Sequence, residues 1–349
     1  MPWIVVALLS EVQVLTSARF GVIGLLSFLY SFGVMAQLPP DINQLTPEAA
    51  YEKGELLRAQ FKDKEARDYL QYAAEAGNVK AQYLYAMSLL TYHPTSRHKP
   101  IAKTYLIKAA QSDYRPAMFE LYHREGLLSR DDQVEWKQRY LDALLESEKA
   151  DSDEADFYLY QFYRQNERDE DTAEAYFDKA LNAEQPLAMY EQAKNLQKGD
   201  GFYFFQSNRF AEMNEWLAKS ASQGYIPAYR KLIQNYEAEG DYKNAYDWRV
   251  KLLQQGDLLS LASMGNILLG HSGEGYASFI NKRLGLEYLN LYLKFAGTDR
   301  MAATYDKAKD NYDRAFKKLT EAEREQHEEL MSSKLDSVQF VYSDRYFSH

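Results

Sequence analysis

Tyr105-Leu106-Ile107-Lys108-Ala109-Ala110 is one of seven copies of a pattern that reads aromatic-Leu-x-Lys-small-small. The copies begin 32 to 40 residues apart along the chain. Self-similarity at this period is typical of repeat proteins, in which each unit buries its apolar face only against its neighbours. We interpret the leading aromatic residues as a structural ladder of core or half-buried side chains: Tyr69, Tyr105, Tyr140, Tyr176, Trp216, Trp248 and Tyr288.

Each copy has apolar residues at helical spacing and is soon followed by a signal that ends a helix. Gly77, Gly224 and Gly256 stand where a left-handed residue is expected after the last turn. A second helix then begins, at proline in three units, and proline is tolerated in a first helical turn. One unit is therefore a helix hairpin, and the chain is predicted to be all-α, a right-handed α-solenoid of stacked hairpins.

The segments Ala73–Tyr83 and Lys219–Ala228 resemble the Sel1-like repeat, a branch of the tetratricopeptide superfamily. The resemblance covers about residues 47–315. It implies that the protein holds other proteins together. Exported bacterial members of this family look like scaffolds of cell-envelope assemblies such as exopolysaccharide export or the flagellar motor.

The N-terminus has the pattern of an export signal. Phe20–Ala36 is an uncharged, largely apolar run of 17 residues that follows Arg19 and ends in small side chains before Gln37. A membrane-spanning helix needs about 20 apolar residues, so cleavage is favoured over an uncleaved anchor. We expect a signal peptide over 1–36, with translation starting near Val14 or Leu15, and a periplasmic protein without a stable transmembrane anchor.

The remaining boundaries follow from the repeat. We expect a linker over 37–46, the solenoid over 47–304 in about seven units, a capping helix over 305–331 and a tail over 332–349. The capping helix is predicted because its apolar residues occupy one stripe and its other faces are charged.

Composition excludes several classes of protein. The formal net charge is −10 and no basic stripe is present, which argues against nucleic acid as a partner. The chain has no cysteine, which removes disulfides, thiolate nucleophiles and thiolate metal sites.

No catalytic constellation is evident either. His327–Met331 begins like a zinc-protease helix but lacks the second histidine, and Gly199-Asp200-Gly201 lacks the rest of a phosphate loop. The acidic run 151–156 lacks the glycine and glutamate of a calcium loop. We therefore predict no enzyme activity, no metal and no cofactor.

Three segments are candidate binding surfaces, since exposed aromatic residues are favoured contacts at interfaces. In the third unit, aromatic residues over 157–163 are spread around the helix, although neighbouring units could cover all of them. The second is a loop inside a 40-residue repeat, and the third is the tail 338–349, which could add to a sheet edge of a partner. The residues selected for partner binding are Tyr158, Tyr160, Tyr163, Phe202, Tyr203, Phe204 and Phe205.

The leading functional hypothesis is a non-catalytic scaffold that binds protein partners in a cell-envelope assembly. The alternative is a carbohydrate-binding module in which tyrosines of the solenoid groove stack on the sugar rings of a polysaccharide.

Overall fold

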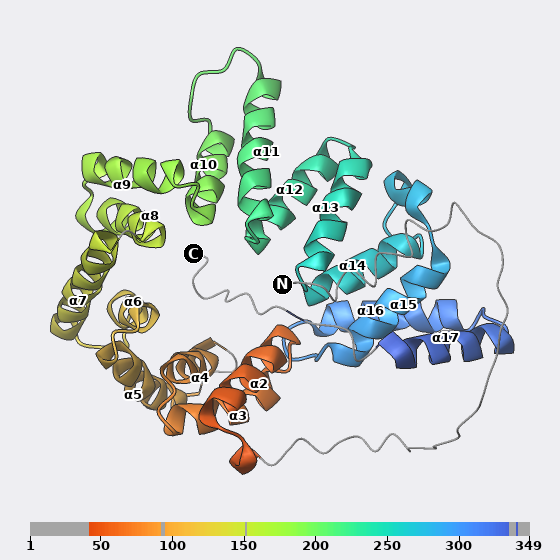
Figure 1. Ribbon diagram of the computed structural model, residues 1–349, viewed down its shortest axis with the longest axis horizontal. Helices are drawn as coiled ribbons and strands as arrows, with labels where there is room; N and C mark the ends of the chain where they lie inside the picture. Colours follow the sequence, from red (N-terminus) through yellow and green to blue (C-terminus); the bar gives the residue numbers. More distant parts are fainter. Residues whose placement is uncertain (1–41, 92–94, 151, 335–339, 341–349) are drawn as a thin grey trace.

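The computed structural model describes residues 42–91, 95–150, 152–334 and 340, and these form helices joined by short turns. Fourteen of the helices form seven antiparallel pairs (Figure 1). The pairs are α2 (Pro47–Ala59) with α3 (Asp63–Glu75), α4 (Val79–Thr91) with α5 (His98–Gln111), α6 (Arg115–His123) with α7 (Arg130–Lys149), α8 (Asp153–Phe162) with α9 (Glu170–Asn182), α10 (Pro186–Lys198) with α11 (Gln206–Ser222), α12 (Ile226–Ala238) with α13 (Tyr242–Gln254), and α14 (Leu258–Leu268) with α15 (Lys282–Phe295). Shorter turns of helix are η1 (Ile42–Gln44), the π-helical η2 (Tyr163–Glu167) and η3 (Glu274–Phe279).

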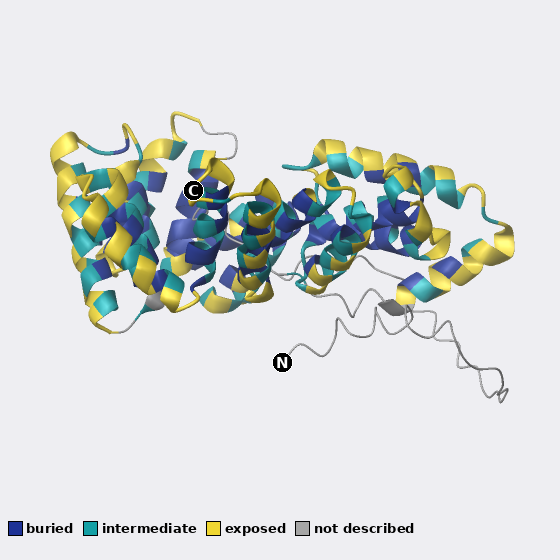
Figure 2. Ribbon diagram, turned by 90° about the horizontal axis from the view of Figure 1, so that it is seen from above, coloured by how far each residue is buried: buried dark blue, intermediate teal, exposed yellow. Residues whose placement is uncertain are grey.

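The predicted repeat is confirmed. Every copy of the aromatic pattern lies on the second helix of a pair, and Gly77, Gly224 and Gly256 have φ of 95°, 90° and 79° after that helix. The apolar core runs between the two helices of each pair and on to the next pair (Figure 2). The chain is therefore an all-α solenoid of helix hairpins.

Close packing within a pair depends on a small residue facing the leucine of the pattern. A Cβ atom added to Gly54 would lie 2.7 Å from Leu70, and one added to Gly265 would lie 2.6 Å from Leu289. Such contacts are shorter than any ordinary Cβ contact, so these two helix pairs can approach this closely only where the first helix carries glycine.

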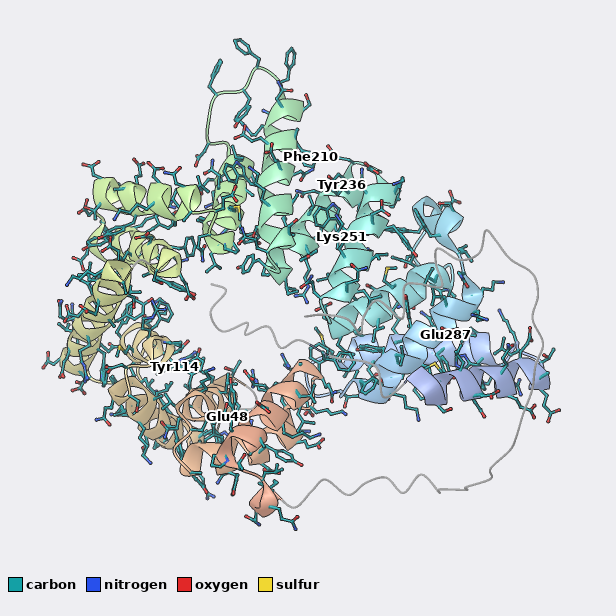
Figure 3. All side chains as sticks on the ribbon, in the orientation of Figure 1. Glu48, Tyr114, Phe210, Tyr236, Lys251 and Glu287 are labelled. Atoms are coloured by element: carbon teal, nitrogen blue, oxygen red, sulfur yellow. The ribbon has the colours of Figure 1, made fainter. Side chains whose placement is uncertain are left out.

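The aromatic ladder divides into two kinds of residue. Tyr69, Tyr140 and Tyr288 are buried, whereas the other four are half-buried. Each half-buried ring has a lysine three residues later whose ammonium lies over its face, at 3.7 to 5.1 Å from the ring centre. The pairs are Tyr105 with Lys108, Tyr176 with Lys179, Trp216 with Lys219, and Trp248 with Lys251, the last of which Figure 3 labels on α13.

The C-terminal cap differs from the expectation. The segment predicted as one helix over 305–331 forms two, α16 (Ala302–Phe316) and α17 (Glu321–Lys334). The break occurs because Thr320 and Glu323 form a reciprocal cap, in which the Thr320 amide donates to the Glu323 carboxylate at 2.8 Å. The second of these helices, α17, packs on α15 through His327, which lies 3.0 Å from Asn290.

The helix pairs follow a closed ring (Figure 1). In its left half, α4, α6 and α8 lie on the inner side and α5, α7 and α9 on the outer side. The turn between α2 and α3 meets the segment that links α15 to α16, so the first pair of helices contacts the last one.

Some predictions concern residues outside the described ones. These are the signal peptide over 1–36, the first half of the linker (37–41), and the tail beyond residue 334 except for Phe340, whose ring lies 4.9 Å from that of Phe295. None of the helices in the described ranges is both long and apolar enough to cross a membrane.

Candidate functional site

The aromatic residues over 157–163, which lie on α8 and at the start of η2, are mostly part of the core. Phe157, Tyr160 and Phe162 are buried, and Tyr160 is only 5% exposed. Tyr158 and Tyr163 are half-buried, and the Tyr163 ring stacks on that of Tyr176 at 5.7 Å. The prediction that Tyr160 belongs to an exposed surface is therefore wrong.

The reason is that α8 is covered on more than one side. The ring of Tyr160 lies 4.7 Å from that of Phe177 on α9, and its hydroxyl accepts a hydrogen bond from Arg164. The ring of Phe162 instead faces Tyr140 on α7, at 6.3 Å. Aromatic residues on different sides of α8 are thus buried against two neighbouring helices, so they need not lie on one apolar stripe.

The loop between α10 and α11 behaves differently. Phe202, Phe204 and Phe205 are 83%, 85% and 67% exposed, and they stand among the few large apolar side chains that the described residues leave in solvent. The loop projects away from the ring and its aromatic side chains point outward (Figures 1 and 3). We call Phe202–Phe205 the Phe loop.

Glycine fixes the course of this loop. Gly199 ends α10 with φ of 111°, and Gly201 follows with φ of 78°, both in the left-handed region that favours glycine. A Cβ atom on Gly201 would lie 2.8 Å from the Tyr203 ring, so this side chain would have to move for any other residue to be present.

Tyr203 anchors the loop to its own unit. Its hydroxyl donates to the Glu212 carboxylate at 2.7 Å, and this hydrogen bond raises the pKa of Tyr203. The Arg209 guanidinium lies 5.2 Å from the ring centre and donates to the Gly201 carbonyl at 3.4 Å. The four aromatic residues selected in this loop therefore differ in exposure. Tyr203 is half-buried and holds the turn, whereas the three phenylalanines extend into solvent.

The exposed rings are arranged before any partner binds. Phe202 and Phe204 contact each other edge to face, with ring centres 5.1 Å apart. Phe210, one turn along α11, is half-buried against the core instead (Figure 3). Because the contacts of Tyr203 with Glu212 and Arg209 restrain the loop, ordering the rings on binding costs less conformational entropy than it would in a flexible loop.

Charges near the loop largely compensate one another. Glu191 on α10 pairs with Lys194 at 2.6 Å and lies 3.9 Å from Lys198. On α11, Arg209 and Glu212 both engage Tyr203. An apolar contact at the ring edges, rather than charge, would therefore supply most of the binding free energy here.

Among the described residues, no three His, Asp or Glu side chains come together in a way that could hold a metal ion. His327 is buried against α15 and α16, where Asn290 and Tyr312 approach its Nε2 at 3.0 and 3.4 Å. Burial lowers the pKa of His327. The histidine of the segment 327–331 thus packs the cap against the last helix pair.

Comparison with known proteins yields no matching family model and no matching curated protein. Among solved structures, the chain is similar to a protective antigen of uropathogenic Escherichia coli with an SLR fold, at 17% identity and a TM-score of 0.33, over 88% of this chain and 71% of that one. It is also similar to a Sel1 repeat protein from Oxalobacter formigenes, at 18% identity and a TM-score of 0.36, over 62% of this chain and 88% of that one. An immunity protein from Pseudomonas aeruginosa is similar at 17% identity and a TM-score of 0.41, over 68% of this chain and 84% of that one. Sel1 repeat proteins are thus among the structures that the chain is similar to.

Proposed function

We propose that the protein is a non-catalytic adaptor that binds a protein partner through the Phe loop. One observation carries this proposal: three phenylalanines are held in solvent on a turn whose backbone is fixed. Leaving such side chains exposed has no stabilising effect on the fold, whereas burying one phenylalanine contributes about 1.5–3 kcal/mol. Exposed aromatic anchors of this kind dominate the energetics of many interfaces.

The chemistry of the site defines the partner surface. Two rings in edge-to-face contact form an apolar projection, which fits an apolar pocket and not a flat polar face. We infer that the partner is a folded protein with such a pocket. A periplasmic position in an envelope assembly is part of the proposal, and it rests on the export-signal pattern and the resemblance to exported scaffolds.

The binding test uses a triple substitution, Phe202→Ser, Phe204→Ser and Phe205→Ser, in the full chain. Capture of partners from envelope extracts should fall about tenfold or more, because the anchors are lost while the turn is kept. Val134→Ser is the matched control, since Val134 is 62% exposed on α7, far from the loop. Equal capture by the triple variant and the control would contradict the proposal.

The position in the cell has its own test. Fractionation should place a form beginning at Gln37 in the periplasm. A membrane-bound species that keeps residues 20–36 would contradict cleavage without affecting the role of the Phe loop.

The carbohydrate-binding alternative has less support. Sugar stacking requires a free ring face, and the four half-buried ladder residues have theirs occupied by lysine. Affinity electrophoresis in alginate would detect this activity as retarded migration, which we do not expect.

A further inference from the structure

The contact that closes the ring joins residues far apart in the sequence. The Gly297 amide donates to the Gln60 carbonyl at 2.6 Å, and the Asp299 amide donates to the Phe61 carbonyl at 3.3 Å. A Cβ atom on Gly297 would lie 2.5 Å from the Phe61 oxygen, so the two backbones meet this closely only because residue 297 is glycine. We call the contact of residues 58–64 with residues 297–300 the seam.

Charged side chains complete the seam. Arg300 Nε lies 2.5 Å from Asp63 Oδ2, and Arg58 Nη1 lies 3.7 Å from Asp63 Oδ1. Arg300 also donates to the Arg58 carbonyl. At the edge, the Lys64 amide donates to the Asp299 carboxylate at 2.9 Å. Arg58 and Asp63 are buried, so the ion pairs are shielded from solvent and their geometry is specific.

Phe61 shows that the turn between α2 and α3 is adapted to the seam. Its φ is 60°, in the left-handed region, where the turns after α10 and α12 have Gly199 and Gly240. A bulky residue is disfavoured in this region. Phe61 is nevertheless 4% exposed, because its ring lies within the core cluster of the C-terminal helices and under Arg300 at 4.9 Å. The contact of Phe61 with the other end of the chain thus offsets the unfavourable backbone conformation at this residue.

The two surfaces of the seam are unlike each other. A contact between unlike surfaces closes a ring within one chain, or joins the head of one chain to the tail of another. In an exchanged dimer, two chains form two seams, so the contacts per chain are the same as in the closed monomer. The balance then depends on concentration and on how easily the solenoid unbends.

One sector of the ring has the packing needed for unbending. Ala173 and Ala180 are the buried apolar residues of α9, and both are small. Arg168 and Glu184 flank this helix with φ of 56° and 53°, each in the left-handed region without being glycine. Between the two large clusters of buried side chains among the described residues, only a small cluster around α8 and α9 lies in this sector. The helices α9 and α10 also contact each other less than any other two consecutive helices of neighbouring pairs, so rotation between them would break the fewest contacts.

We propose that the seam is exchangeable and that its alternative partner is a second copy of this chain. In the resulting head-to-tail dimer, the α2–α3 turn of each copy docks on residues 297–300 of the other. This inference is independent of the Phe loop, because the loop lies on a different part of the ring.

The first test measures the molar mass of the purified, naturally processed protein as a function of its concentration. Light scattering from about 1 µM to about 500 µM should show monomer giving way to dimer. Phe61→Gly removes the ring from the seam and gives the turn the residue that its conformation favours, so the hairpin should still fold. Because the closed monomer and the dimer lose the same ring contact, Phe61→Gly should populate an open, more extended monomer at low concentration, whereas Val134→Ser should not. Monomer throughout the concentration range, or a Phe61→Gly chain as compact as the natural one at low concentration, would overturn the proposal.

The second test uses the absence of cysteine from the natural chain. Lys64 and Asp299 face each other across the seam, so one preparation carries Lys64→Cys and another Asp299→Cys. After mixing at high concentration and mild oxidation, a disulfide between the two chains can form at the seam only by exchange. We expect a cross-linked heterodimer, and no comparable cross-link in a preparation of Lys64→Cys alone, because the two Lys64 residues of a head-to-tail dimer lie at different seams. No cross-link, or the same yield with Lys64→Cys alone, would show that the seam stays within one chain.

Discussion

Two turns of this molecule present phenylalanine, and they use it in opposite ways. At the turn between α2 and α3, Phe61 is buried against the other end of the chain, in a backbone conformation that glycine would adopt more easily. At the turn between α10 and α11, Gly199 and Gly201 take the left-handed positions, and the phenylalanines extend into solvent. The first turn has its binding partner within the ring, and we propose that the second docks on a partner outside it.

Truncation of the two kinds of phenylalanine gives the largest expected difference. Phe61→Ala should lower the free energy of unfolding by about 3–5 kcal/mol, because it removes a buried ring and leaves a cavity. Phe204→Ala should change it by less than about 0.5 kcal/mol, because the ring is in solvent. Urea denaturation followed by circular dichroism measures both. Equal losses would mean that the Phe loop is part of the core.

Removing the arginine that contacts each turn should give a smaller difference in stability between the two turns. Arg300→Met should cost about 1.5–3 kcal/mol at pH 7, because it takes a charged hydrogen-bond donor from buried Asp63. Arg209→Met should cost less than about 1 kcal/mol, since its contacts are partly in solvent.

The effect of Arg300→Met should also depend on pH. Burial already raises the pKa of Asp63, and Arg300 acts against this rise. Without the guanidinium the pKa rises further, so the neutral carboxyl becomes easier to bury. The loss of stability should therefore shrink as the pH falls below 7 and Asp63 takes up its proton. A loss that grows in acid would contradict this account of the seam.

Tyr203→Phe should have a modest effect and one confined to the Phe loop. It removes the hydrogen bond to Glu212, worth about 0.5–1.5 kcal/mol, and keeps the ring. Partner capture should weaken because the turn is less fixed, whereas closure of the ring should be unchanged. Crosslinking across the seam of a chain that carries both Lys64→Cys and Asp299→Cys provides the control for closure.

The smallest effect concerns His327, whose cap lies beside the seam end of the ring. Burial lowers its pKa, with Glu287 and Glu328 acting in the opposite direction. The unfolded chain then binds more protons near pH 6.5, so this contribution to stability is present above that pH and is lost as the pH falls. Melting temperatures between pH 7.5 and 5.5 should drop in the natural chain and drop less in His327→Gln.

The repeat could be predicted from the sequence because its signals are local. The pattern residues, the capping glycines and the prolines each act within one turn of a helix. The break before α17 was also accessible, since Thr320 and Glu323 form a capping box in the sequence.

The seam could not be predicted in the same way. It joins Asp63 to Arg300, 237 residues apart, and depends on how seven pairs of helices add their rotations. Its one local signal is Phe61 at a turn where other pairs have glycine. For the third unit, helical angles identify too many aromatic residues for one stripe, but only the packing shows that α7 and α9 cover Phe162 and Tyr160.

Closure also determines how this molecule can evolve. An open solenoid gains or loses units freely, because each added hairpin only lengthens the array. In a ring, the angular increments of all units must sum to the value at which Gly297 reaches Gln60. Duplicating or deleting one hairpin would displace the two ends by a whole angular increment, and the seam could no longer form. The seam therefore fixes the number of repeats. Insertions are tolerated in turns such as the one that carries the Phe loop, because they leave the angles between the hairpins unchanged.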